Sequence, residues 1–144
     1  MAPNSPPKPV PVPDEYSQGF WDAAASHTLA IQRCQSCGFF SYPPVILCPS
    51  CQSQDREFRF EPVSGRGTIR TWTVMRQAFL PGFQGDVPYV VAEVELEEQP
   101  GLKMIGQLVD GMNAELTIGA PVEVVFEDVA EGMSVPHFQM RTQR

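Results

Sequence analysis

Four cysteines are the residues whose types and spacing point most directly to chemistry. They form two CxxC pairs separated by ten residues, and they are Cys34, Cys37, Cys48 and Cys51. Two intervening residues let both sulfurs of a pair face one ion, and a ten-residue hairpin returns the second pair to the first. Four thiolates then close a tetrahedral shell at about 2.3 Å from Zn²⁺. The spacing therefore predicts a zinc ribbon that holds one structural ion.

Two other uses of these thiols stay open. CxxC pairs also serve as redox dithiols, and four thiolates also bind iron in centres of the rubredoxin type. The presence of two pairs at ribbon spacing favours zinc over both alternatives. A closed shell of four sulfurs leaves no coordination position for a substrate, so we expect a structural ion that contributes to folding.

The rest of the sequence contains no recognisable catalytic motif. It has no GxSxG, no HExxH and no phosphate-binding glycine loop. The two histidines, His27 and His137, do not adjoin a nucleophile in an interpretable pattern. Gly65 and Gly67 precede a predicted strand rather than a helix, so they are not a dinucleotide fingerprint. With all four thiols assigned to metal, the sequence favours binding over catalysis.

The charge of this 144-residue chain is acidic and unevenly distributed, with a net value of −7. Residues 86–131 contain eleven acidic side chains against one lysine, whereas residues 33–76 contain six arginines against three acids. Lysine and arginine contacts to phosphates supply most of the affinity of nucleic-acid binders, so general nucleic-acid binding is disfavoured. An anionic ligand is expected to prefer the arginine-bearing region.

The sequence also bears on the compartment. No stretch approaches the roughly 20 apolar residues of a membrane helix. The first residues lack the basic and then apolar pattern of a secretory signal. Clustered free thiols are typical of a reducing compartment. We therefore expect a soluble cytoplasmic protein with no membrane span.

The first 33 residues divide into a proline-rich tail and a helical segment. Residues 1–13 contain six prolines, which fix φ and remove backbone donors, so we expect a flexible tail of polyproline II character. Residues 14–33 are predicted to hold a helix that has Asp14 as its N-cap and that fades near His27. A short strand from Leu29 to Arg33 is expected to lead into the first cysteine pair.

The remainder is predicted to be mainly β. Residues 34–61 form the expected zinc ribbon and link, and the short link spans roughly residues 52–62. Residues 62–144 alternate apolar and polar side chains with the period of strands. Five short strands with one helical turn near 110–119 favour a barrel of the oligonucleotide/oligosaccharide-binding (OB) type. The expected strands span residues 68–75, 89–96, 104–109, 122–126 and 137–141, and a long loop spans 76–88.

Several blocks of sequence occur in an order that resembles a known family. These blocks are the FW pair at Phe20 and Trp21, LAIQRCQSCG, YPP, CPSC, VSGRGTIRTWTV, PYVVAEVEL, IGQLV and IGAPVEVVFE. The chain resembles the acyl-CoA-associated zinc-ribbon/OB-fold family, a domain of unknown function found with thiolase-like enzymes. The resemblance covers nearly everything after the proline-rich tail.

The resemblance implies both a fold and a role. The implied fold is an N-terminal helix, a rubredoxin-like zinc ribbon and a C-terminal OB barrel. Family members are partners of thiolase-like enzymes, including aldolases of steroid side-chain breakdown and acyltransferases of small-aromatic biosynthesis. The resemblance carries over the four cysteines as metal ligands and no catalytic residue. It implies a non-catalytic accessory subunit, in a hetero-oligomer, that supports its partner through complex formation and acyl-CoA handling.

Two sets of residues are candidates for such binding. The first set consists of aromatic and aliphatic side chains. We expect them either to pack on the barrel or to anchor a partner protein, and they are Phe20, Trp21, Phe79, Leu80 and Phe83. The second set consists of four arginines. We expect them either to contact the phosphates of CoA or to be solvated, and they are Arg56, Arg59, Arg66 and Arg70. Among them Arg66 has glycines on both sides, which leaves its approach unhindered.

The leading hypothesis is thus an accessory subunit of a thiolase-like enzyme that acts on acyl-CoA esters. Ribbons and OB folds also bind nucleic acids, and this alternative rests on analogy of fold alone. A free-standing acyl-CoA hydrolase or transferase is the third hypothesis, although it requires a base and a nucleophile that the sequence does not nominate.

Overall fold

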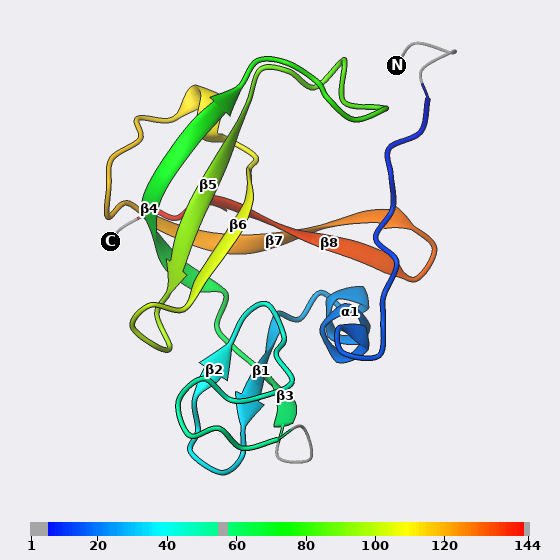
Figure 1. Cartoon of the computed structure of the whole chain (residues 1–144). Helices are drawn as coiled ribbons and strands as arrows, with labels where there is room; N and C mark the ends of the chain where they lie inside the picture. Colours follow the sequence, from blue (N-terminus) through cyan, green and yellow to red (C-terminus); the bar gives the residue numbers. More distant parts are fainter. Residues whose placement is uncertain (1–5, 55–57, 143–144) are drawn as a thin grey trace.

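The computed structural model describes residues 6–54 and 58–142. Within these described residues, one short helix is followed by eight strands, and a 3₁₀ turn lies between the sixth and seventh strands (Figure 1). The elements are α1 (Gln18–Ala25), β1 (Ala30–Cys34), β2 (Phe40–Ser41), β3 (Phe58–Pro62), β4 (Arg66–Met75), β5 (Tyr89–Leu96), β6 (Lys103–Leu108), η2 (Gly111–Asn113), β7 (Pro121–Ala130) and β8 (Met133–Met140). No described helix is both long and apolar enough to cross a membrane.

The strands form one small sheet and one closed barrel. The sheet has the order β2-β1-β3, and the barrel has the order β4-β5-β6-β8-β7. All pairings are antiparallel except the one between β6 and β8, which consists of a single position, Leu108 with Phe138. This five-stranded barrel with a helical turn between its third and fourth strands confirms the predicted OB type.

Period-two alternation explains the barrel wall. In β5, Val90, Ala92, Val94 and Leu96 are buried, and the residues between them are only half-buried. A side chain at Gly67 in β4 would collide with the carbonyl oxygen of Glu95, so glycine permits close pairing of these two strands. The buried side chains then fill the barrel around Phe138, which is fully buried.

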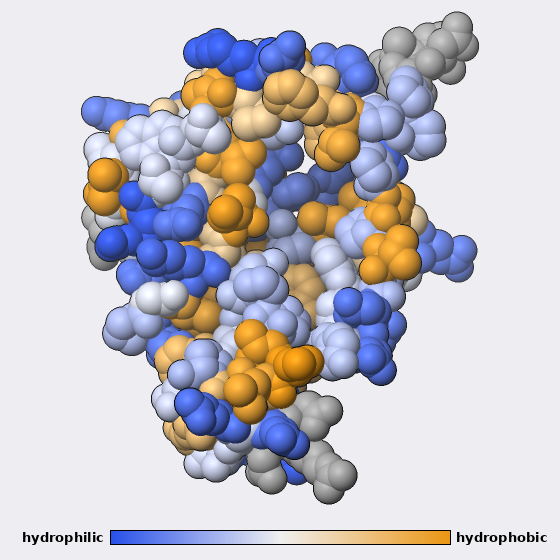
Figure 2. All heavy atoms as spheres, in the orientation of Figure 1, coloured by the Kyte–Doolittle hydropathy of each residue, from blue (hydrophilic) through white to orange (hydrophobic). Residues whose placement is uncertain are grey.

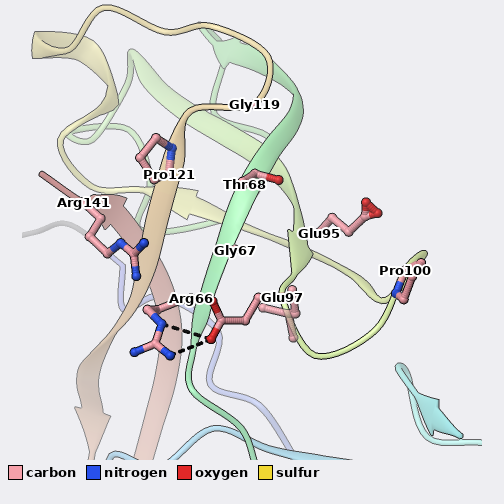
Figure 3. A pocket seen from close by; sticks show the side chains of 10 residues that line it. Arg66, Gly67, Thr68, Glu95, Glu97, Pro100, Gly119, Pro121 and Arg141 are labelled. Atoms are coloured by element: carbon pink, nitrogen blue, oxygen red, sulfur yellow. Dashed lines mark hydrogen bonds and ion pairs between the residues drawn. The ribbon is translucent and has the colours of Figure 1, made fainter. Parts of the chain in front are cut away.

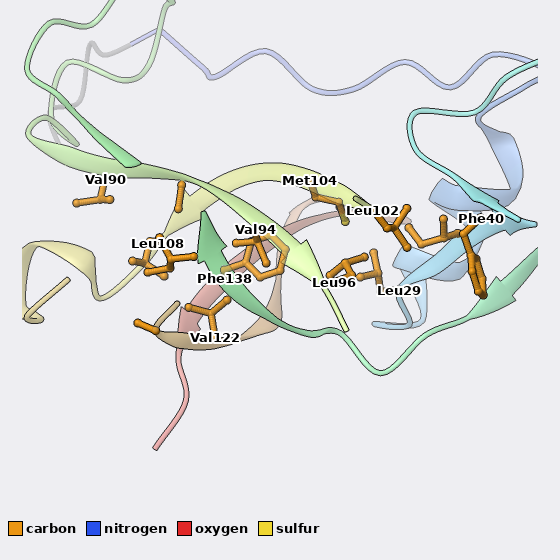
Figure 4. Packing of buried hydrophobic residues seen from close by; sticks show 14 of the residues in the cluster. Leu29, Phe40, Val90, Val94, Leu96, Leu102, Met104, Leu108, Val122 and Phe138 are labelled. Atoms are coloured by element: carbon orange, nitrogen blue, oxygen red, sulfur yellow. The ribbon is translucent and has the colours of Figure 1, made fainter. Parts of the chain in front are cut away.

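The hydrophobic core does not stop at the end of the barrel. Leu29, which precedes β1, and Phe40 of β2 belong to the same buried cluster as Leu96, Leu102 and the barrel interior (Figure 4). The ribbon is therefore packed onto the lower end of the barrel by apolar contact. Burial of this kind stabilises by about 25 cal/mol per Å² of apolar surface removed from water.

The helix begins later than predicted. Asp14 does not cap α1, since its carboxylate accepts hydrogen bonds from the backbone amides of Tyr16 (3.0 Å) and Ser17 (2.8 Å) and so shapes the turn before the helix. Ser17 is the N-cap residue and Gln18 the first helical residue. Inside the helix, a side chain at Gly19 would collide with the ring of Phe60 in β3, so this glycine lets α1 lie against the ribbon sheet.

The expected short link at 52–62 contains a strand in its last part. Residues Phe58–Pro62 form β3, which pairs with β1 over its full length. The alternation of Phe58 and Phe60 with polar residues was a strand signal, but it is short. The last two barrel strands are also longer than predicted, because a hairpin that turns at Gly132 (φ 71°) extends both.

Candidate functional site

The four cysteines converge in the ribbon. Their sulfur atoms all lie within 4.8 Å of one another, and the Cys34–Cys51 and Cys37–Cys48 sulfur pairs are each 3.7 Å apart. Four sulfurs placed tetrahedrally at about 2.3 Å from one ion would be about 3.8 Å apart. The donor set therefore fits a tetrahedral metal ion, and the predicted cluster forms within the described residues.

The two cysteine pairs lie in two separate loops that have the same pattern of backbone hydrogen bonds. In the first loop, the amide of Gly38 donates to the carbonyl of Cys34 (2.8 Å), and the amide of Cys34 donates to the carbonyl of Phe39 (2.9 Å). The second loop repeats both bonds, from Gln52 to Cys48 and from Cys48 to Ser53, each at 2.9 Å. Both loops need a residue of positive φ, which Gly38 (81°) and Gln52 (65°) supply. The two CxxC motifs thus form matching loops, and each loop contributes two sulfurs to the same cluster.

The cluster is half enclosed by protein. Cys34 and Cys48 are buried, whereas Cys37 and Cys51 face solvent. The hydroxyl and the backbone amide of Ser53 lower the pKa of the Cys51 thiol to about 6. Thiolate is the form that binds metal, so this neighbour prepares Cys51 as a ligand. With four sulfurs in place the shell is closed, and no position is left for a substrate.

The loop between the two pairs is held from beneath by a buried amide. The side chain of Gln32, which is 5% exposed, donates to the carbonyl of Val45 (3.0 Å) and accepts from its amide (2.8 Å). The side chains of the next two residues are exposed to solvent, Ile46 to 62% and Leu47 to 48%. Apolar side chains accordingly gather on the front of the ribbon (Figure 2).

Ile46 and Leu47 were not among the predicted binding residues. Their signal was the run of three aliphatic residues, Val45 to Leu47, between a proline pair and Cys48. Such a run reads as ribbon core from the sequence, because spacing alone does not tell which side of a small loop faces water.

The predicted partner-binding aromatics of the helix separate into two environments. Phe20 is 4% exposed, and its ring packs edge-on against Trp21 at 5.0 Å and beside Tyr42 at 5.6 Å. It is therefore a core residue that joins the helix to the ribbon, which agrees with the packing alternative, and its contact with a partner stays a prediction. Trp21 is half-buried at the edge of the same cluster.

The long loop after β4 carries the other three candidates. Phe79 is 76% exposed and Leu80 is 55% exposed. Phe83 turns inward, where its ring lies 6.2 Å from that of Tyr89, the first residue of β5. Exposed apolar side chains at a loop tip are costly unless a partner covers them. Phe79 and Leu80 are thus exposed in the free chain, whereas Phe83 packs against the start of β5.

The predicted arginines are not brought together into one site. Arg59 lies on β3 in the ribbon, and Arg56 lies outside the described residues. Arg70 faces Glu95 at a distance of 3.9 Å. Arg66 makes two hydrogen bonds to one carboxylate oxygen of Glu97, at 3.0 and 2.7 Å.

Arg66 nevertheless borders a cleft at the lower end of the barrel. The cleft has a volume of about 400 Å³, and its walls include the backbone at Gly67 and Gly119 and the side chain of Arg141 (Figure 3). Arg141 was not predicted, because it follows the last barrel strand and no motif marks it. Two guanidinium groups in one cleft can bind an anionic group, although the carboxylate of Glu97 would compete with that group for Arg66.

Both histidines are engaged with carboxylates. Nε2 of His27 lies 2.7 Å from Oδ1 of Asp128, and its ring stacks on Phe126 at 5.4 Å. The hydroxyl of Ser134 donates to the same oxygen of Asp128 at 2.5 Å. His27 and Ser134 thus both contact Asp128, and this carboxylate lies between them. These contacts join the segment that follows α1 to the β7–β8 hairpin and do not form a nucleophile–base pair.

The second histidine is similar. Nε2 of His137 lies 2.7 Å from Oε2 of Glu127 on the neighbouring strand. Among the residues that the structure describes, the four cysteines are the only group of potential ligands close enough to share a metal ion.

Comparison with protein-family models places two matches in sequence order. Residues 21–57 match the model described as the ChsH2 rubredoxin-like zinc ribbon domain. Residues 60–127 match the model described as the ChsH2 C-terminal OB-fold domain. Together the two models cover the metal cluster and most of the barrel.

Relatives in sequence are scaffold proteins and hydratase subunits. The chain is 37% identical over 99 residues to a DUF35 domain-containing scaffold protein of Methanocaldococcus jannaschii, covering 69% of this chain and 67% of that protein. It is 36% identical over 107 residues to a scaffold protein of the same description from Methanothermobacter thermautotrophicus, covering 73% and 76%. It is 37% identical over 109 residues to the 3-oxo-4,17-pregnadiene-20-carboxyl-CoA hydratase alpha subunit of Mycobacterium tuberculosis, covering 76% of this chain but only 33% of that subunit.

A solved structure matches nearly the whole fold. A chain of the Ltp2-ChsH2(DUF35) aldolase superposes with a TM-score of 0.77 at 28% sequence identity, covering 90% of this chain and 98% of that chain.

Proposed function

Because this chain belongs to the DUF35 family, with a ChsH2-type zinc ribbon and OB-fold barrel, we propose that it is a non-catalytic accessory subunit of a thiolase-like enzyme. The proposed partner is an aldolase or acyltransferase that acts on acyl-CoA esters, and the active form is a hetero-oligomer. The observation that carries the proposal is the structural similarity to a chain of the Ltp2-ChsH2(DUF35) aldolase, which covers 98% of that chain.

The names of the relatives favour support over chemistry. The archaeal relatives are named scaffold proteins. The hydratase alpha subunit is about three times as long as the matched region, since the chain spans 33% of it, so its activity is not assigned to this chain. The closed thiolate cluster and the engaged histidines agree with a supporting role.

We propose that the ribbon holds one structural Zn²⁺ through Cys34, Cys37, Cys48 and Cys51. The support is the tetrahedral spacing of the sulfurs and the repeated pair of loops. Bound there, the ion supplies four bonds that cross-link the ribbon, and no reaction step is assigned to it. A cluster of reduced thiols also agrees with the proposed cytoplasmic location.

Two surfaces are proposed to serve the partner and its substrate. Phe79 and Leu80 of the long loop form the proposed partner contact, with Ile46 and Leu47 of the ribbon as a second contact. Their exposure on two defined loops is the support, because exposed aliphatic and aromatic side chains mark protein interfaces. The cleft between Arg66 and Arg141 is the proposed place for an anionic part of an acyl-CoA, such as a CoA phosphate.

Co-purification tests the main proposal. A tagged full-length chain, expressed together with thiolase-like proteins from the same genome, is expected to elute with one of them at a fixed ratio and to change its turnover of acyl-CoA esters. A well-expressed set of such partners that never co-elutes, and whose activity is unaffected by this chain, would falsify the proposal. Thioester turnover by the pure isolated chain would contradict its non-catalytic part.

A further inference from the structure

Residues 6–13 run as an extended segment along the side of the barrel before they reach α1 (Figure 1). We call this segment the strap. Five of its eight residues are proline, so it has few backbone donors and cannot join a sheet as an inner strand. Proline also restricts the unbound segment to extended shapes, which lowers the entropy that docking removes.

Lys8 is the contact point of the strap. Its ammonium nitrogen lies 2.5 Å from Oδ2 of Asp86 and 5.0 Å from the centre of the Phe83 ring. Phe83 in turn lies against Tyr89 of β5. A carboxylate and an aromatic face together form a site for one cationic side chain, and this site is built from the long loop at residues 76–88.

The two backbones also touch. A side chain built on Gly82 would meet the backbone nitrogen and the Cγ of Lys8 at 2.7 Å. Gly82 has a φ of 85°, so glycine serves both the turn and the close approach. The strap therefore contacts the loop through its main chain as well as through the Lys8 ammonium group.

The position of this contact is informative for an OB barrel. Barrels of this type bind ligands on a face bordered by the loop after the first strand and the loop between the last two strands. Here these are residues 76–88 and the hairpin turn at 131–132. The pKa of Lys8 is raised, chiefly by its hydrogen bond to Asp86 and to a smaller extent by Glu127, which lies near the hairpin. The surface is hollowed beneath the loop on the side that the strap borders (Figure 2).

We propose that the strap docks in cis on the loop at residues 76–88, with Lys8 as its anchor, and holds this loop in the shape that presents Phe79 and Leu80. A connection of this length, with two glycines and two prolines, loses much conformational freedom when it is ordered. A loop that is ordered before the partner arrives binds more tightly, because the cost of ordering is already met. The effect on partner binding, though not the ordering itself, rests on the function proposed above.

Hydrogen exchange of the isolated full-length protein tests the ordering. We expect Lys8→Met to speed amide exchange in residues 82–87 by roughly three- to ten-fold, the range expected for loss of one ion pair and one cation–π contact. Lys103→Met is the matched control, since it removes a lysine that faces Glu93 at 3.9 Å on the barrel wall. The exchanged pair Lys8→Asp with Asp86→Lys is expected to restore part of the protection. Unchanged exchange in Lys8→Met would overturn the proposal.

Partner affinity separates an ordering strap from an inhibitory one. With the co-purified thiolase-like partner, Lys8→Met is expected to raise the Kd by roughly two- to five-fold. A lower Kd for Lys8→Met would mean that the strap competes with the partner, and it would overturn the proposal. If no such partner binds even the unaltered chain, the function proposed above is wrong, and the exchange measurement alone decides whether the strap orders the loop.

Discussion

Gln99 and Phe40 join the barrel to the ribbon through two hydrogen bonds. The side-chain amide of Gln99, in the turn between β5 and β6, donates to the backbone carbonyl of Phe40, and its oxygen accepts from the backbone amide of Phe40, both at 2.9 Å. The short strand β2 thereby receives from a barrel side chain the partners that a neighbouring strand would supply. The same arrangement, with Gln32 and Val45, occurs inside the ribbon.

Replacement of Gln99 by alanine is expected to lower the free energy of unfolding by about 1–3 kcal/mol. The reason is that the amide and carbonyl of Phe40 would lose their partners in a partly buried place. Chemical denaturation of the zinc-loaded protein measures the change. Gln77→Ala, at an exposed loop position, is the control and should be within about 0.5 kcal/mol of the parent. An equal effect of both variants would remove the special role of the Gln99–Phe40 pair.

Metal content gives a second prediction. We expect one zinc ion per chain by elemental analysis, with loss of stoichiometric zinc in Cys48→Ser and retention in Ser50→Ala. Removal of zinc by a chelator should expose the amides of the ribbon sheet to exchange, because the ion supplies much of the folding energy of such a small unit. A chain that folds identically with no bound metal would contradict this prediction.

The exposed loop tip gives a third prediction. Phe79→Asp and Leu80→Asp are each expected to weaken partner binding at least about ten-fold, as truncation of a central interface residue commonly does. Thermal stability should stay unchanged, because both side chains are solvent-exposed in the free chain. Ile118→Asp is the matched control, since Ile118 is 72% exposed on a different loop. Equal weakening by all three would show a general effect of charge rather than a contact at this loop.

The arginine cleft gives a fourth prediction. We expect CoA to bind the chain more tightly than pantetheine, which lacks the nucleotide phosphates, and to lose this advantage in the double variant Arg66→Met with Arg141→Met. Loss of two charge-assisted contacts should weaken CoA binding by roughly ten-fold or more. Arg76→Met, at an exposed position outside the cleft, is the control. Calorimetric titration at low and moderate salt measures these affinities, and equal binding of CoA and pantetheine would exclude the site.

The contact of the helix with the hairpin gives a prediction about pH. Hydrogen bonds from His27 and then Ser134 lower the pKa of Asp128 below the ordinary value of 3.8 for an aspartate side chain. A lowered carboxyl pKa adds stability that is present above the unfolded-state pKa and is lost as pH falls through the folded-state pKa. The destabilisation by Asp128→Asn should therefore be larger at pH 7 than at pH 3. Denaturation curves at both pH values measure it, with Glu115→Gln as the control. A difference independent of pH would refute this assignment.

Local patterns predicted the barrel and the metal cluster well. Strand β5 has the predicted bounds because its alternation is complete, and the barrel type was predicted from five short strands with one helical turn. The metal cluster could be predicted because ligand spacing within CxxC depends only on a few neighbouring residues. Both features are local, so a single sequence contains enough information for them.

The features that the sequence left open concern contacts between distant segments. The burial of Phe20 depends on Tyr42, which the cysteine-bearing segment brings to the helix. The pairing of β3 with β1 likewise depends on the metal loop that lies between them. Apolar spacing shows that a side chain prefers cover, but it does not say whether the cover comes from the same chain or from a partner. The same limit explains why the separation of the arginines could not be predicted.

The seam between β6 and β8 has a consequence for motion. These strands pair at one position, Leu108 with Phe138, whereas β7 and β8 pair at eight. The ring of Phe138 also presses on Gly106, where a larger residue would be crowded. The free energy of local opening of the barrel is therefore expected to be lowest between β6 and β8, where few hydrogen bonds must break. A transient slit here would admit water beside Phe138 while both long hairpins, β4–β5 and β7–β8, kept their registers.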